Sequence, residues 1–405
     1  MEALYIALLS SNRVIDKIKN MTGINPGYAG QKFNRLIVEG LNKNNVKTKA
    51  YSSIPMSRHY SKKTWWNEGV ENENGIEYKY FPFINFPVIH QLCLFVFSFI
   101  YVLRWGCRNH KEKFILLDVL NISICIGSLL ACKLTRVHCV GVVTDMPGLI
   151  VGASDATMGS NHGIITKISK TILSSFNSYV FLTMQMNEVI NKKNKPYLVM
   201  EGMVDYSIGQ SVMTEMTLVS NRKVLYAGGL HERYGLRTLV DSFMNLENPE
   251  YRLIIYGSGP YAGELKEKSK LDSRIEYRGV APNEEVMNEE INCALLVNPR
   301  PTNEEFTKYS FPSKNMEYMS TGRPLLTTKL PGMPPEYYPY VYLFNDESCS
   351  GFEKTMESIL TLTDEELTMK GAMAQKWVLH YKNNVVQTAK IIELVNACIF
   401  DNNEN

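Results

Sequence analysis

The chain lacks the short patterns by which many metal and disulfide sites are recognised. Its eight cysteines include no CxxC pair, its seven histidines form no HxxxH or HExxH pattern, and there is no DxD. Cys125, Cys132 and Cys139 recur at seven-residue intervals in an apolar region, which predicts buried thiols rather than ligands. We therefore expect no dedicated metal site, no disulfide framework and a reducing, cytoplasmic environment.

An excess of charge of one sign is also missing. The 43 Lys and Arg residues nearly balance the 41 Asp and Glu residues, for a net charge of +2. A near-neutral chain gives no reason to expect nucleic acid as a partner. The N-terminal apolar run, residues 4–9, lacks the basic start and small-residue cleavage site of a signal peptide, so we expect a buried strand there.

Very long apolar runs are absent as well. The most apolar segment, residues 91–105, falls short of the roughly 18–20 apolar residues that span a bilayer. Arg104, Arg108, Lys111 and Lys113 lie at its end. We favour a helix buried between a sheet and its neighbours. The alternative is a peripheral membrane contact through residues 91–113, with the basic flank on anionic headgroups.

What the chain does contain is an alternation of short apolar strands and amphipathic helices, which occurs twice. Two parallel, doubly wound α/β domains are therefore expected, and 405 residues suffice for two cores. A segment without clear periodicity, residues 206–222, connects them. The expected strands are residues 4–9, 46–51, 76–81, 114–120, 137–143, 179–183 and 197–200 in the first half, and 224–227, 251–256, 274–277, 294–297, 325–328 and 341–344 in the second.

A stretch after the fourth strand of the second half, residues 308–326, reads K-Y-S-F-P-S-K-N-M-E-Y-M-S-T-G-R-P-L-L. Ser310 or Ser313 can cap a helix here, with a proline in its first turn. The helix N-terminus favours an anion, Lys314 adds a charge, and Glu317 suits vicinal hydroxyls. The stretch is a candidate seat for a diphosphate attached to a ribose. The alternative is an ordinary connection with a solvated Glu317.

Two features of the first half are candidates for ligand contact. A glycine-rich loop, residues 23–30, follows the first strand, although its glycines do not match GxGxxG. It can approach a ligand at the sheet edge or simply turn the chain. Asp145 follows a strand at the edge where open α/β sheets place their chemistry, and it can equally cap the next turn.

Seven stretches, taken in order, resemble the GT-B glycosyltransferases, and more narrowly the family-4 retaining enzymes of bacterial surface polysaccharide and capsule synthesis. The resemblance implies two doubly wound domains facing across a cleft. Residues 1–205 would form the acceptor side, residues 206–383 would bind the donor, and a final helix over 384–400 would pack back on the first domain. The stretches are V-T-D-M-P-G (143–148), E-G-M-V-D (201–205), Y-A-G-G-L-H-E-R-Y-G (226–235), L-I-I-Y-G-S-G-P (253–260), E-Y-R-G-V (276–280), N-P-R (298–300) and S-F-P-S-K-N-M-E-Y-M-S-T-G-R-P (310–324).

The resemblance also implies a site for a nucleotide-sugar. Glu317 matches the second Glu of the family's E-x7-E pattern and would bind the ribose, whereas Tyr309 stands where the first Glu is expected. The main chain at Val280 would contact the base. The same edge would be lined by Gly257, Ser258 and Gly259.

The diphosphate contacts depart from the family pattern. Gly229 stands where the family commonly has Arg, and Tyr234 where it commonly has Lys, so Arg233 and Lys314 are the available cations. Asp145 occupies the acceptor-side position and could orient the attacking hydroxyl. Further phosphate contacts would come from Gly27, Gly30, Gly229 and Ser313.

These residue types fit the breaking of a sugar–phosphate bond, because fixed cations can stabilise the leaving diphosphate without a metal. We therefore expect a bacterial glycosyltransferase, cytoplasmic and peripheral on the inner face of the plasma membrane. It would use a UDP- or GDP-sugar and no cofactor, retain the anomeric configuration, and act on a glycan or lipid-linked acceptor. Two alternatives remain: a GT-B-type sugar-nucleotide epimerase, and a non-catalytic nucleotide-sugar-binding subunit of a transferase complex.

Overall fold

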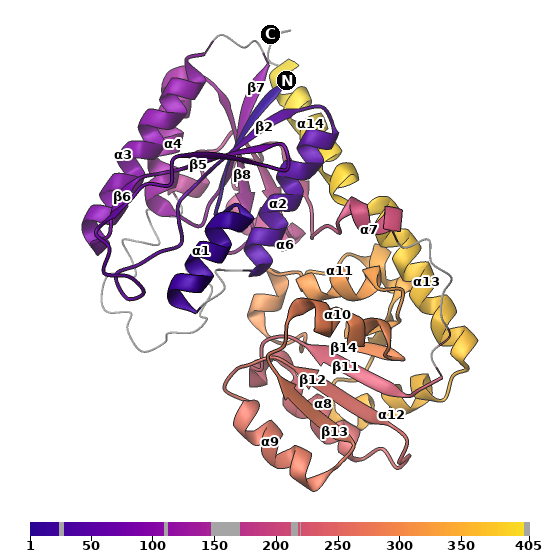
Figure 1. The fold of residues 1–405 in the computed structure, drawn as a ribbon. Helices are drawn as coiled ribbons and strands as arrows, with labels where there is room; N and C mark the ends of the chain where they lie inside the picture. Colours follow the sequence, from indigo (N-terminus) through magenta and orange to yellow (C-terminus); the bar gives the residue numbers. More distant parts are fainter. Residues whose placement is uncertain (24–27, 109–111, 147–170, 212–217, 219, 401–405) are drawn as a thin grey trace. The chain divides into compact units, whose positions relative to one another are not determined.

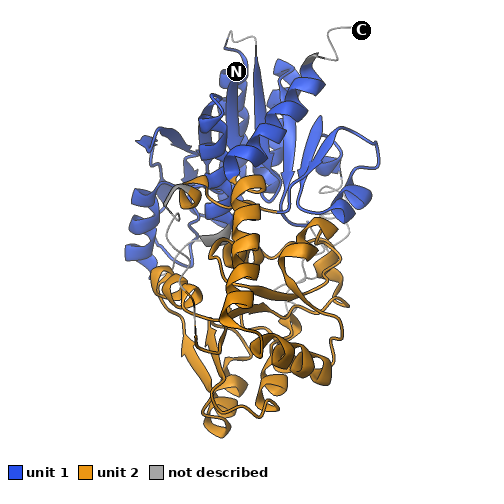
Figure 2. Cartoon of the chain, turned by 90° about the vertical axis from the view of Figure 1, so that its right-hand side faces the viewer, with its two compact units in different colours: residues 1–201, 384–405 blue, residues 202–383 orange. Residues whose placement is uncertain are grey.

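The computed structural model describes residues 1–23, 28–108, 112–146, 171–211, 218 and 220–400 (Figure 1). The chain forms two compact units, residues 1–201 with 384–405, and residues 202–383 (Figure 2). Each unit is built around a parallel sheet. The sequence analysis placed the division between residues 205 and 206, and the compact units divide between Glu201 and Gly202.

The first unit contains an eight-stranded sheet in the order β10-β9-β8-β7-β1-β2-β5-β4. Its strands pair in parallel except for β4, which runs antiparallel to β5. The strands are β1 (Glu2–Ile6), β2 (Lys47–Ser52), β4 (Val70–Glu73), β5 (Ile76–Tyr80), β7 (Lys113–Asp118), β8 (His138–Val143), β9 (Ser178–Phe181) and β10 (Tyr197–Val199), and β3 (Trp65–Trp66) pairs separately with β6 (Phe83–Ile84).

The described helices of this unit include one that the sequence analysis did not predict. Helix α1 begins after Ser11, whose hydroxyl accepts a hydrogen bond from the Val14 amide, and it ends at Gly23 in the left-handed conformation, φ 70°. Both features are common helix boundaries. The described helices are α1 (Asn12–Thr22), α2 (Tyr28–Lys43), α3 (Pro87–Gly106), α4 (Ile122–Thr135), α6 (Met184–Ile190) and α14 (Asn384–Phe400).

Helix α14, the C-terminal helix, packs against α2. A Cβ atom on Gly40 would lie only 2.3 Å from the carbonyl oxygen of Asn384, so the two backbones are in close contact. The Asn44 amide donates to the Val385 carbonyl at 2.8 Å. These contacts place residues 384–400 in the first unit.

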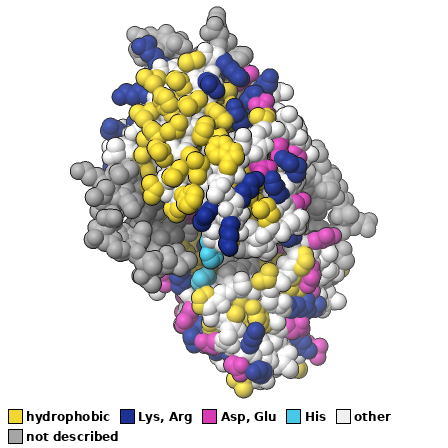
Figure 3. All heavy atoms as spheres, turned by 60° about the vertical axis from the view of Figure 1, so that its left-hand side comes forward, with side chains coloured by type: hydrophobic (Ala, Val, Ile, Leu, Met, Phe, Trp, Pro, Cys, Tyr) yellow, Lys and Arg dark blue, Asp and Glu magenta, His cyan; other side chains and the backbone are white. Residues whose placement is uncertain are grey.

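Helices α3 and α4 cover one face of the same sheet and touch along their backbones. A Cβ atom on Gly127 of α4 would lie 2.4 Å from the Phe95 carbonyl of α3, and one on Gly106 would lie 2.7 Å from Thr135. The interpretation of residues 91–105 as a buried helix holds for one face only, because the other face is exposed (Figure 3). The estimate that this segment is too short to span a membrane is wrong, since α3 has 20 residues and is long and apolar enough by length and composition.

The second unit contains a six-stranded, all-parallel sheet in the order β13-β12-β11-β14-β15-β16. This is the doubly wound order, in which the chain direction across the sheet reverses between β11 and β14. The predicted parallel α/β class is therefore confirmed. The strands are β11 (Lys223–Ala227), β12 (Arg252–Tyr256), β13 (Ile275–Gly279), β14 (Leu295–Asn298), β15 (Leu325–Thr328) and β16 (Tyr342–Phe344).

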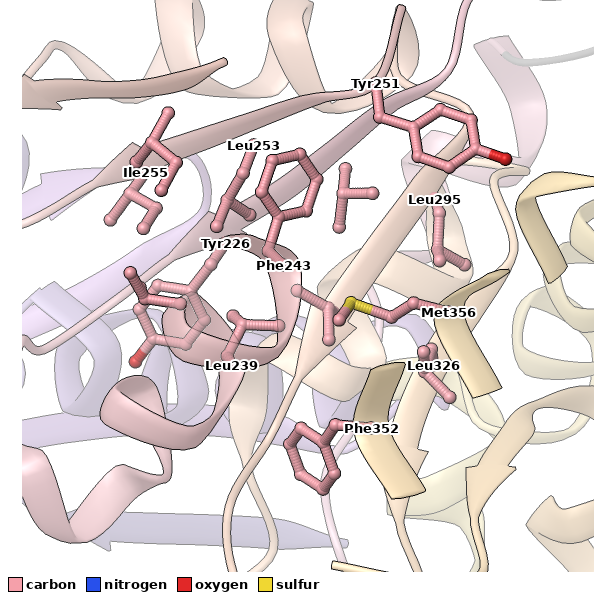
Figure 4. Packing of buried hydrophobic residues seen from close by; sticks show 14 of the residues in the cluster. Tyr226, Leu239, Phe243, Tyr251, Leu253, Ile255, Leu295, Leu326, Phe352 and Met356 are labelled. Carbon is pink, nitrogen blue, oxygen red and sulfur yellow. The ribbon is translucent and has the colours of Figure 1, made fainter. Parts of the chain in front are cut away.

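A hydrophobic core on one face of this sheet holds the edge loops in place (Figure 4). Phe243 of α8 packs over Leu253 of β12, and Phe352 of α12 stacks on Phe344 with ring centroids 3.7 Å apart. The described helices of this unit are α7 (Tyr206–Ser211), α8 (Leu236–Met244), α9 (Ala262–Leu271), α10 (Asn283–Ile291), α11 (Ser313–Ser320), α12 (Cys349–Leu360) and α13 (Asp364–Tyr381), with the short 3₁₀ turns η1 (Glu232–Tyr234), η2 (Glu305–Lys308) and η3 (Pro335–Tyr340).

Buried free thiols were predicted at Cys125, Cys132 and Cys139, and this is confirmed. Within the described ranges, no group of three or more His, Cys, Asp or Glu side chains is arranged to hold a metal ion.

Candidate functional site

Three loops meet at the carboxyl edge of the second sheet. The loop after β11 is tied to the loop after β12 by the Leu230 amide, which donates to the Ser258 carbonyl at 2.9 Å. The Gly257 amide in turn donates to the Gly279 carbonyl, at the end of β13, at 2.7 Å. The edge next to the β11–β14 reversal is therefore a connected backbone surface, which is where doubly wound sheets bind ligands.

Two glycines allow these loops to approach each other. Gly257 has φ 134°, and a Cβ atom there would lie 1.8 Å from the Gly228 carbonyl oxygen. Gly235 has φ 80°, and its Cβ atom would lie 1.9 Å from the Pro299 carbonyl oxygen, in the loop after β14. No side chain fits either position, so both glycines are needed for packing whether or not a ligand is bound.

Arg300 is a candidate site residue that the sequence analysis did not single out. Its guanidinium carbon lies 4.6 Å from the ring centroid of Tyr234 and 5.9 Å from that of Phe306. Among the described residues, the side chain makes no ion pair or hydrogen bond. Burial lowers the pKa of Arg300, and the charge of Arg233 adds to this effect, against the opposing influence of Tyr226 and Tyr234. An arginine remains charged in such a setting. The carboxyl edge of the second sheet therefore carries a cation that can bind an anion.

Arg233 lies over the same two rings. Its guanidinium carbon is 5.3 Å from the Phe306 centroid and 5.7 Å from the Tyr234 centroid. Tyr234 thus does not replace the charge of the lysine that the resemblance leads one to expect. Its ring instead supports two arginines that come from different loops. The sequence contains a signal for Arg300, because this residue comes two positions after the end of the buried strand β14.

Helix α11 starts differently from the sequence-based expectation. Pro312 is its N-cap, without a side-chain hydrogen bond, and the helix begins at Ser313. The expected cap by Ser310 or Ser313 is wrong, because the Ser310 hydroxyl donates to the Phe306 carbonyl at 3.1 Å. The first turn is instead fixed by Asn315, whose side-chain oxygen accepts from Asn298 at 2.6 Å.

Lys314 lies between two carboxylates. Its ammonium nitrogen is 2.8 Å from Oε1 of Glu317 and 3.1 Å from Oε1 of the fully buried Glu290. Burial alone would lower the pKa of Lys314, but the carboxylates of Glu317 and Glu290 outweigh it and raise the pKa. The charge of Lys314 is thus engaged within the protein. Its position suits orientation of Glu317 better than direct contact with a phosphate.

The remaining predicted donor residues lie on the same edge, and most are open to solvent. Val280 follows β13 and is 75% exposed. The Tyr226 hydroxyl donates to the Gly229 carbonyl at 2.9 Å, which fixes the loop after β11. The exposed members of this predicted set are Gly229, Ser258, Val280 and Ser313.

On the first unit, Asp145 is half-buried two residues beyond β8, and burial raises its pKa. Its neighbour Asp118, which the sequence analysis did not single out, ends β7 and is 6% exposed. Burial raises the pKa of Asp118 to about 7, and the nearby charge of Asp145 contributes. Two carboxyl groups with raised pKa values thus lie at the carboxyl edge of this sheet.

Gly30, which was predicted to lie in a glycine-rich loop, is part of a helix instead. Gly30 lies in the first turn of α2, exposed, with no atom within 4 Å of the position of a Cβ. Gly27 lies outside the described residues.

Comparisons with known proteins agree with this architecture. Residues 221–361 match the family model described as Glycosyl transferases group 1. No curated protein sequence matches the chain.

Solved structures resemble the chain over nearly its whole length. Sucrose-phosphate synthase from Thermosynechococcus elongatus has a TM-score of 0.66 at 13% identity, covering 98% of this chain and 99% of that one. HepE from Anabaena, in complex with UDP, has a TM-score of 0.61 at 11% identity, covering 98% and 100%. The catalytic domain of starch synthase IV from Arabidopsis thaliana, bound to ADP and acarbose, has a TM-score of 0.64 at 8% identity, covering 98% and 99%. The chain therefore has the GT-B fold, and residues 221–361 of its second unit are similar to the group 1 glycosyl transferases.

Proposed function

We propose that the protein transfers a sugar from a nucleoside-diphosphate sugar, a UDP- or GDP-sugar, to a hydroxyl of a glycan or lipid-linked acceptor. The observation that carries this proposal is the position of Arg300. Its charge lies beside Arg233, over the rings of Tyr234 and Phe306, where the strand order reverses. Solved GT-B structures with UDP, UDP-glucose and ADP support a nucleotide donor.

The donor's three parts have different partners in this proposal. The base lies along Val280 and the loop Gly257–Gly259, and the ribose hydroxyls bind Glu317. Lys314 holds Oε1 of Glu317 at 2.8 Å and thereby orients the carboxylate toward the ribose. The diphosphate lies against Arg300 and Arg233, which take the place of the family's usual cations at Gly229 and Tyr234.

The chemistry follows from this arrangement. As the sugar–phosphate bond breaks, negative charge grows on the departing diphosphate, and fixed guanidinium groups stabilise it without reorganising. Both arginines are already positioned by ring contacts, so transfer proceeds without a metal and continues in the presence of a chelator. We propose retention of the anomeric configuration, with Asp145 orienting the acceptor hydroxyl.

One observation favours a second candidate, a non-catalytic subunit that binds a nucleotide-sugar. Tyr309, rather than Glu, stands where the resemblance leads one to expect a contact to the donor sugar. The two candidates differ in turnover and not in donor binding.

The test is to incubate the protein with a panel of UDP- and GDP-sugars and an acceptor membrane extract, and to measure nucleoside diphosphate and glycan product. The transferase proposal expects donor-dependent release of both. Arg300→Met should lower turnover by about 10²–10³-fold, the range for removing one preorganised transition-state donor. Arg237→Met is the matched control, because Arg237 forms partly exposed ion pairs with Glu232 and Glu264. Tight donor binding without turnover, with acceptor present, would favour the subunit instead.

A further inference from the structure

The outward side of α3 and α4 forms an apolar surface, here called the α3–α4 face. Its exposed apolar side chains are Phe86, the N-cap of α3, Val88, Ile89, Leu92 and Val96 on α3, and Leu130 and Leu134 on α4. Val88 is 82% exposed, Leu134 67% and Leu92 58%. Residues 88, 92 and 96 follow one another at helical spacing, so they form a continuous stripe. Figure 3 shows this surface as a broad hydrophobic patch on the first unit.

The inner side of α3 belongs to the fold. Leu94, Ser98 and Val102 are buried. The Phe95 carbonyl leaves no room for a Cβ on Gly127 of α4, with only 2.4 Å between them. Crossing a bilayer would separate α3 from these contacts, although its length and composition would permit it. The structure therefore favours a helix that lies along a surface.

The charged side chains that α3 and α4 themselves carry are all basic. Neither α3 nor α4 contains Asp or Glu. Arg104 and Lys133 lie in their last turns, Arg108 and Arg136 follow, and all four side chains are exposed. Gly106 and Thr135 are in close contact, so the C-terminal ends of α3 and α4 lie side by side. The four cations are therefore close to one another. A second copy of the chain would present the same cations, whereas an anionic surface complements them.

A cavity extends the apolar surface behind α4. It has a volume of about 750 Å³, and its lining includes Ile126, Leu129, Ile172 and Ile399, together with the cations Lys133 and Arg136. Apolar side chains beside clustered cations match the two parts of an anionic lipid, its acyl chains and its phosphate.

We propose that the α3–α4 face binds the surface of an anionic phospholipid bilayer, with α3 lying in the interface and Arg104, Arg108, Lys133 and Arg136 on the headgroup phosphates. This inference is independent of the proposed transferase activity. It goes beyond the sequence-based expectation for residues 91–113 by including α4, its cations and the cavity.

The experiment measures co-sedimentation of the full chain with vesicles of phosphatidylcholine alone, and with vesicles in which about a quarter of the lipid is phosphatidylglycerol. We expect binding to the anionic vesicles that weakens between about 0.1 M and 0.5 M salt, because headgroup attraction is screened. Leu92→Glu should weaken binding by at least about tenfold, since an apolar contact is lost and a like charge is added. Leu271→Glu is the matched control, because Leu271 is a 78% exposed leucine on the second unit.

Two further variants separate the parts of the proposal. Arg104→Gln with Lys133→Gln should lower affinity for anionic vesicles by roughly 25-fold, at about fivefold for each cation. A folded wild type that fails to bind anionic vesicles would overturn the proposal, as would equal binding by Leu92→Glu and Leu271→Glu. A wild-type dimer that Leu92→Glu converts to a monomer, without vesicle binding, would assign the face to a second copy. Donor binding by Leu92→Glu should stay at the wild-type value, which separates this test from that of the proposed function.

Discussion

The ammonium nitrogen of Lys314 lies 2.8 Å from Oε1 of Glu317, one helical turn away on α11. Its second partner, the fully buried Glu290 on α10, lies 3.1 Å away. One cation thus contacts two carboxylates from different helices. This relationship makes Lys314 a positioning residue for Glu317 in the proposed donor site.

Lys314→Met should therefore affect both stability and donor binding. Glu290 loses this cation, and removing one partner of a buried ion pair costs on the order of 3 kcal/mol in the free energy of unfolding. Glu317 loses the contact that orients it, so the donor dissociation constant should rise. Urea unfolding and calorimetric titration with UDP and GDP measure the two effects.

The double variant Lys314→Met with Glu290→Gln distinguishes these effects. Both variants lack the Lys314–Glu290 ion pair, so a difference in stability between them reports on the other contacts of Glu290, while donor binding stays weak in both because Glu317 is not held. Wild-type donor affinity in either variant would remove Lys314 from the proposed site.

Arg300→Lys should weaken donor binding while leaving the protein folded. The charge is kept, but the planar guanidinium that lies over Tyr234 and Phe306 is lost, and with it the bidentate geometry suited to a phosphate. We expect about a tenfold rise in the donor dissociation constant, or roughly 1.4 kcal/mol. Titration of Arg300→Lys and of the control Arg237→Lys with the donor measures the change in the donor dissociation constant. Equal donor affinities of the two variants would argue against direct contact between Arg300 and the diphosphate.

The pKa of Asp118, about 7, makes the stability of the first unit depend on pH. An unfolded aspartate releases its proton near 3.8, whereas the folded protein keeps it until about 7. The folded state thus holds an extra proton between these values, so its stability falls as pH rises from about 4 to about 7, by at most on the order of 4 kcal/mol.

Asp118→Asn should remove this dependence. The melting temperature of the variant relative to wild type should increase from pH 4 to pH 8, and the amide oxygen can still accept the 3.1 Å hydrogen bond from Leu120. Asp16→Asn, at an exposed carboxylate on α1, is the control. A difference between Asp118→Asn and wild type that does not change with pH would show that Asp118 ionises normally in the folded protein.

Gly127→Ala should destabilise the first unit by about 1–3 kcal/mol, the usual cost of overpacking. The added Cβ would meet the Phe95 carbonyl and the Ser98 hydroxyl, each at 2.4 Å, so α3 and α4 must separate. Gly30→Ala in α2, where no atom lies within 4 Å, should be neutral or stabilising. Similar unfolding midpoints for both alanine variants would contradict the close α3–α4 packing.

The sequence by itself determined the parallel α/β class and most element positions, because buried parallel strands are short apolar runs separated by helical periodicity. It missed α1, where Ser11 begins a helix whose buried residues are only Val14 and Ile18. It also placed Asp145 and Arg233 in segments that follow strands, and Glu317 on the helix after the fourth strand of the second half, since such positions depend only on chain order.

Tertiary structure alone decided which of these groups act together. No sequence spacing connects Lys314 with Glu290, Arg300 with Tyr234, or Asp118 with Asp145, because each pair comes from different elements joined by the sheet. The same holds for the α3–α4 face. An apolar helix can be buried or exposed, and the packing of α3 against α4, including the close approach of Gly127 to the α3 backbone, fixes which side of α3 faces inward and which remains open.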